Sequence, residues 1–123
     1  AKVIAEIQAI PSKNIAISGA QAYIACVVDC EPPAVFEGHH FSLEDCAAAV
    51  ENMLLAITGL GYASVWIDGW LRVEGRASKI GKILNLPEAK SVQVLLPIGR
   101  PLEQWQPKEK LPFNKRVTFN RYL

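Results

Sequence analysis

The chain has 123 residues, enough for one domain with its own hydrophobic core and too few to suggest two. Its formal net charge is +1 and its acidic and basic residues are interspersed, which excludes the strong surface field that recruits nucleic acid or anionic membranes. No apolar run approaches the roughly 20 residues of a membrane-spanning helix, and no signal-peptide pattern is present. These features predict a cytoplasmic protein.

Half of the residues are hydrophobic, more than a chain of this length easily encloses, so we expect a partner to cover part of its surface. The three cysteines cannot all pair. Cys26 and Cys30 are expected on one strand about 13 Å apart, too far for a disulfide. This spacing fits a reducing compartment.

The first elements are a helix and a strand. Residues 1–10 place isoleucine and valine at helical spacing with no capping residue before them, which indicates a helix that begins upstream. A breaker cluster at residues 11–14 ends it. Residues 20–29 are small, β-branched or aromatic and almost uncharged, which predicts a strand buried on both faces.

Ser42 starts the clearest helix. Residues 42–45 resemble a capping box with Asp45 in place of glutamate, and apolar residues follow at helical period until Gly59 and Gly61 end the helix. A run of three alanines leaves one side of this helix thin enough for another backbone to approach closely.

The second half predicts a strand at residues 62–67, a helix at 74–86 and a strand at 91–98. The tail, residues 102–123, mixes prolines and basic residues with a strand-like stretch at 116–120, so it must pack against something else. Helices that alternate with strands in this way predict an α/β (α+β layered) domain.

Four blocks resemble the second half of the FMN-dependent nitroreductase family. They are residues 45–60 (DCAAAVENMLLAITGL), 61–69 (GYASVWIDG), 94–101 (VLLPIGRP) and 107–112 (PKEKLP), in matching order and spacing. The resemblance covers nearly the whole chain and is weakest before Ala20. It implies a nitroreductase-like flavoprotein fold with a central sheet packed by helices, incomplete at the N-terminus, in which residues 1–123 are the C-terminal portion of one domain.

The resemblance also implies a cofactor site. The backbone of Asp68 and Gly69 would face the flavin N5 edge, where N–H donors stabilise the charge that hydride brings to the ring, and Trp66 and Ile67 would line the ring. Gly69 lets the backbone approach closely because it has no Cβ.

A basic pair would hold the FMN phosphate. Lys108 and Lys110 match the family's pair, with a lysine at 110 where arginine is more usual, and Gly99 and Arg100 are close enough in sequence to help. Lysine lacks the bidentate fork of arginine, which predicts looser binding. No catalytic side chain and no metal ligand is expected, because the cofactor carries the chemistry.

The function that the resemblance implies is transfer of hydride from NAD(P)H through FMN to a nitroaromatic, quinone or similar acceptor. The family forms homodimers through the alanine-rich helix and the tail, with active sites at the interface. Its arginine- and serine-rich phosphate-binding segment has no counterpart upstream of Ala1. We therefore expect either a proteolysed or truncated protein, whose missing segment can be present as a separate chain, or a shortened natural relative. We expect the fragment alone to be free of flavin and inactive.

Other interpretations stay open. Taken alone, Asp68-Gly69 is an ordinary turn, the two lysines are ordinary surface charges, and a tryptophan on a strand is usually core. The chain could be a degenerate, non-catalytic dimerisation domain that lacks flavin. A metal-binding module is a weaker alternative, because its candidate ligands fit no standard zinc spacing: Cys26, Cys30, His39, His40 and Cys46. Nucleic-acid binding is disfavoured because the tryptophans, Trp105 among them, are not interleaved with a basic face.

Overall fold

The computed structural model describes residues 2–102 and 108–122, so Ala1, Trp105 and Pro107 lie outside the described residues. Helices and strands alternate, which confirms the mixed fold class predicted from the sequence. In chain order the elements are α1 (Lys2–Gln8), α2 (Ile15–Ser18), β1 (Ala22–Asp29), α3 (Ser42–Gly59), β2 (Ala63–Ser64), α4 (Arg76–Ile83), β3 (Lys90–Gly99) and a 3-10 helix, η1 (Phe113–Lys115).

The three strands form one antiparallel sheet in the order β1-β3-β2. β3 is the central strand, and its apolar run is therefore buried from Val94 to Pro97. The pairing of β1 with β3 runs from Ala22 opposite Ile98 to Asp29 opposite Lys90. β2 is short, and an isolated bridge between Ile67 and Leu95 extends its side of the sheet.

A β-bulge at Gln93 decides which core Val92 enters. Cys26 pairs with Val94, but the next residue of β1, Val27, pairs with Val92, so Gln93 is an extra residue without a partner. Side chains on a regular strand alternate between faces. Because of the extra residue, Val92 lies on the same face as Leu95 although the two are an odd number of positions apart.

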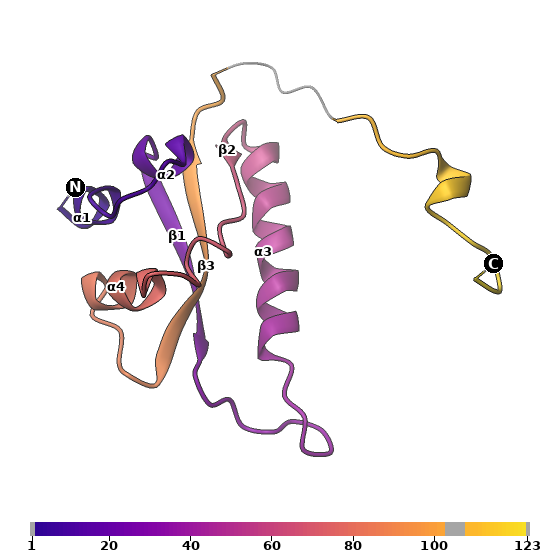
Figure 1. Ribbon diagram of the computed structural model, residues 1–123, viewed down its shortest axis with the longest axis horizontal. Helices are drawn as coiled ribbons and strands as arrows, with labels where there is room; N and C mark the ends of the chain where they lie inside the picture. Colours follow the sequence, from indigo (N-terminus) through magenta and orange to yellow (C-terminus); the bar gives the residue numbers. More distant parts are fainter. Residues whose placement is uncertain (1, 103–107, 123) are drawn as a thin grey trace.

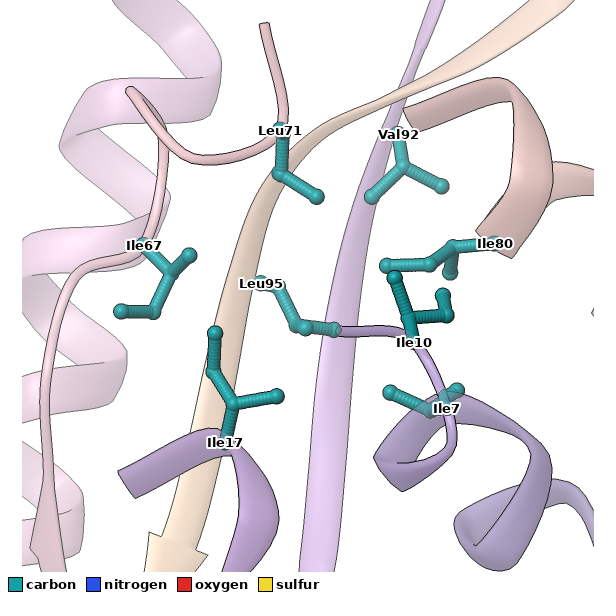
Figure 2. Packing of buried hydrophobic residues seen from close by; sticks show 8 residues of the cluster. All are labelled: Ile7, Ile10, Ile17, Ile67, Leu71, Ile80, Val92 and Leu95. Atoms are coloured by element: carbon teal, nitrogen blue, oxygen red, sulfur yellow. The ribbon is translucent and has the colours of Figure 1, made fainter. Parts of the chain in front are cut away.

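Helices cover both faces of the sheet (Figure 1). On one face Val50 and Ile57 of α3 pack against Val94, Leu96 and Cys26. On the other face the three shorter helices gather isoleucines around Leu95 (Figure 2). The residues of this second core are Ile7, Ile10, Ile17, Ile67, Leu71, Ile80, Val92 and Leu95.

Several local predictions from the sequence are wrong. Among the residues of β1 only Cys26 is buried, since β1 has β3 as its one neighbour within the described chain and lies at an edge. The capping box does not form: Phe41 occupies the cap position, and the hydroxyl of Ser42 contacts His40 Nδ1 at 3.2 Å instead. α2 was not predicted; Asn14 caps it by accepting a hydrogen bond from the Ala16 N–H at 3.0 Å.

The helix predicted from residue 74 begins at Arg76. Glu74 and Gly75 have φ angles of 55° and 64°, in the left-handed region, so neither can continue a right-handed helix. The strand predicted at 62–67 pairs regularly only at Ala63–Ser64. No described helix combines the length and apolar composition needed to cross a membrane.

The described tail, residues 108–122, lies apart from the sheet (Figure 1). It contains η1 and a contact between the rings of Phe113 and Phe119, whose centroids are 6.3 Å apart. Residues 116–120 form no strand in this chain. Its large apolar side chains are exposed, as expected for a segment that cannot build a core of its own: Leu111, Phe113, Val117, Phe119 and Tyr122.

Candidate functional site

The loop after β2, residues 66–69, is anchored by Ile67. The Ile67 N–H donates to the Leu95 carbonyl at 3.1 Å, and the Leu95 N–H donates back to the Ile67 carbonyl at 2.9 Å. The Ile67 side chain is 5% exposed and belongs to the core. Trp66, next to it, is 37% exposed and presents an aromatic surface to solvent instead of packing in the core. The central strand therefore fixes where this loop lies.

In the turn that follows, the backbone carbonyls accept hydrogen bonds, whereas two backbone N–H groups donate to no acceptor among the described residues. The carbonyls of Asp68 and Gly69 accept hydrogen bonds from the N–H groups of Leu71 and Arg72, at 2.8 and 3.3 Å. Within residues 2–102 and 108–122, neither the Asp68 N–H nor the Gly69 N–H donates to a protein acceptor. A Cβ at Gly69 would meet no atom within 4 Å, so the space beside it is open. The turn therefore has two adjacent N–H groups without a protein acceptor among the described residues, and the space beside Gly69 is open.

The Asp68 carboxylate is held by Arg72 in a bidentate ion pair. Arg72 Nε lies 2.5 Å from Oδ1, and Nη2 lies 2.9 Å from Oδ2. This hydrogen bonding raises the pKa of Arg72, and the charge of Asp68 adds to the effect. The pair ties the start of the turn to its end and neutralises the carboxylate beside the two free donors. Sequence reasoning missed Arg72, although its spacing of four residues from Asp68 was a usable signal.

Gly99 and Arg100 lie at a neighbouring cavity of about 580 Å³ formed by α2, β2 and the end of β3. Ser64 and Val65 also line the cavity, so its lining reaches the residue just before Trp66. Its lining is mostly apolar. The buried Ser64 hydroxyl has no hydrogen-bond partner among the described residues, which leaves one polar atom for an added group.

Lys108 and Lys110 are exposed on the tail. The structure brings Trp66, Ile67, Asp68 and Gly69 together on one loop and places Gly99 and Arg100 at the adjacent cavity. It does not bring either lysine to that loop, because the tail lies apart from the sheet (Figure 1). The phosphate-binding pair is not joined to the ring-binding loop within this single chain.

The cysteines and histidines do not assemble a zinc site. In the part of the chain that the structure describes, no group of three or more histidine, cysteine, aspartate or glutamate side chains could hold a metal ion. His39 and His40 are exposed beside a tight turn that pairs Phe36 with His39. All three cysteines are free.

Comparison with known proteins identifies the same fold. The model of the nitroreductase family matches residues 16–100. A relative from Archaeoglobus fulgidus, provisionally named NADH dehydrogenase/NAD(P)H nitroreductase, is 33% identical over 81 residues, which are 65% of this chain and 46% of the relative. One from Methanothermobacter thermautotrophicus with the same provisional name is 32% identical over 82 residues, 67% of this chain and 42% of the relative. The chain thus spans less than half the length of these two relatives.

Solved structures agree on the fold. A crystal structure from Bacteroides thetaiotaomicron, described in the same provisional terms, superposes with a TM-score of 0.77 at 26% identity and covers 98% of this chain and 67% of that one. An FMN-dependent nitroreductase from Clostridium difficile superposes with a TM-score of 0.75 at 22% identity, covering 98% and 70%.

Proposed function

Because the chain belongs to the nitroreductase family, we propose that the intact protein is a cytoplasmic FMN-dependent NAD(P)H oxidoreductase that reduces nitroaromatic, quinone or similar acceptors. The observation that supports this most directly is the pair of unpartnered N–H groups on the open loop at Asp68 and Gly69. A ring nitrogen that accepts hydrogen bonds suits these donors. The relatives' names point to the same reductant class.

The bound flavin would supply the hydride chemistry, and the chain would supply position and electrostatics. Ile67 anchors the loop to the central strand, so the two N–H donors are fixed before a ligand arrives. Trp66 offers an apolar surface to the ring. Arg72 neutralises Asp68, so a negative charge developing on the ring would not meet an unpaired carboxylate.

Lys108 and Lys110 are proposed to bind the FMN phosphate from the tail, assisted by Gly99 and Arg100. The exposed apolar side chains of the tail support a homodimer in which the tail lies on the partner subunit, so that each site draws on both copies. Segments of the protein outside these 123 residues, on the same or a separate chain, would complete the phosphate and substrate contacts.

The test is a visible spectrum of the intact protein during titration with FMN and then NADH. We expect a flavin spectrum that NADH bleaches. Lys108→Ala combined with Lys110→Ala should weaken FMN binding at least tenfold, because charge-assisted hydrogen bonds contribute about 1.5–3 kcal/mol each. The matched control removes two exposed lysines of α4, Lys79→Ala with Lys82→Ala. Equal affinity in both double variants would remove Lys108 and Lys110 from the site.

A second candidate is a non-catalytic dimerisation domain, and the apolar surface of α3 favours it. Leu43 and Leu55 are exposed on this helix, and Ala47 and Ala48 leave it thin. A protein that stays colourless with added FMN yet remains dimeric by light scattering would support this candidate over the oxidoreductase. Ala48→Leu should weaken such a dimer, since an added side chain prevents close helix approach. An unaltered dimer would exclude this face.

A further inference from the structure

Three of the four sulfur-bearing side chains in this protein line a single cavity. The chain has three cysteines and one methionine. Cys26, Cys46 and Met53 line a cavity of about 420 Å³ between β1 and α3. The fourth sulfur, that of Cys30, is on an exposed residue beyond the end of β1 and lies outside the cavity.

The fold places these sulfurs on facing surfaces. Cys46 and Met53 are seven residues apart on α3, about two helical turns, so they lie on the same side of the helix. Cys26 is buried on the sheet face that α3 covers, and both Cys46 and Met53 pack against the core cluster that contains it. Burial raises the pKa of the Cys26 thiol, and the neighbouring Cys46 raises it further, which is consistent with two thiols in close proximity.

We propose that Cys26 and Cys46 form a binding site for a soft, thiophilic metal ion, with Cu(I) as the ion that fits best. Thiolate ligands select soft ions of this kind, and two thiolates suit the low coordination number of Cu(I). Met53 lies about 10.5 Å from Cys46 along the helix axis, too far to bind the same ion. The proposal differs from a zinc module because it uses neither histidine, Cys30 nor a carboxylate. It shares no residue with the flavin loop and stands whether or not the protein binds FMN.

The binding step balances without an oxidant. Cu⁺ displaces one proton from each thiol and forms two copper–sulfur bonds, giving a bis-thiolate with net charge −1 and two protons released to solvent. Cys46 is half-buried, which gives the ion and the protons a route. Lys90 lines the same cavity and forms an ion pair with Asp29 at 2.5 Å. The carboxylates of Asp29 and Asp45, which also line it, are hard ligands unsuited to Cu(I).

The test is an anaerobic titration of the chain with Cu(I) in competition with a chromophoric Cu(I) chelator. We expect one equivalent bound per chain, with binding kept in Cys30→Ser. Cys46→Ser should weaken binding at least roughly tenfold, the lower end of what even outer-shell changes cost metal sites. Met53→Leu conserves volume and removes a sulfur of the same cavity that lies too far from Cys46 to bind the ion, so we expect it to leave the affinity unchanged.

Thermal unfolding separates ligand loss from misfolding, because Cu(I) should raise the Tm of the wild-type chain and of Cys30→Ser but not of Cys46→Ser. Wild-type affinity in Cys46→Ser would overturn the proposal. So would loss of binding in Cys30→Ser, which would identify adventitious binding at the exposed thiol.

Discussion

Leu95→Ala tests the central position of β3. The Leu95 side chain is 0% exposed and lies among the isoleucines of the helices on its face of the sheet (Figure 2). The substitution removes three buried carbon atoms at about 0.8 kcal/mol each, which gives a transfer loss of about 2.4 kcal/mol. A residual cavity adds about 24 cal/mol per Å³, so we expect the free energy of unfolding to fall by about 3–4 kcal/mol.

Urea unfolding followed by circular dichroism measures this change. Leu102→Ala is the matched control, because the same chemical change at a residue that is 95% exposed should cost less than about 0.5 kcal/mol. A loss below about 1 kcal/mol at Leu95, or equal losses at the two positions, would refute the argument that the core beneath the short helices depends on β3.

Two other perturbations probe single polar contacts. Burial raises the pKa of Tyr23, whose hydroxyl donates a hydrogen bond to the Ile17 carbonyl. The stability that the protonated hydroxyl contributes is therefore complete below the ordinary tyrosine pKa. It is lost as pH rises through the higher pKa of the folded state. Tyr23→Phe should cost about 1 kcal/mol at pH 7 and flatten the loss of stability above pH 10, whereas an alkaline profile identical to wild type would contradict the assignment. Arg72→Gln should release Asp68 and speed amide hydrogen exchange at Leu71 with little change in Tm, and unchanged exchange would show that the ion pair does not hold the turn.

The sequence predicted elements whose signal is local and repeated. The helix from Ser42 and the strand at residues 91–98 carry periodic apolar patterns, and both are present close to their expected bounds. Contacts between distant segments were missed. The burial of β1 depends on which strand lies beside it, and the bulge at Gln93 depends on how β3 pairs with β1, so neither could be predicted from one segment.

The sequence likewise predicted one part of the candidate site and not the rest. The loop at 66–69 could be located from the family resemblance, and its anchoring by Leu95 and its free donors emerged only from the three-dimensional arrangement. The cavity beside Gly99 and Arg100 also depends on α2, which was too short to predict. The position of the lysines depends on where the tail lies, and a sequence pattern does not determine that.

The bulge at Gln93 sets how this chain tolerates changes in length. Upstream of it β3 contributes Val92 to the core beneath the short helices, and downstream it serves both cores. Deleting Gln93 would place Val92 directly before Val94, so regular alternation would keep Val92 on the face of Leu95, in the core where it already lies. Substitution at this position keeps the extra residue and changes only a half-buried side chain. We therefore expect many residues to be accepted at position 93, and we expect deletion of the position to remove the bulge while the pairings of β1 with β3 on both sides of it are kept.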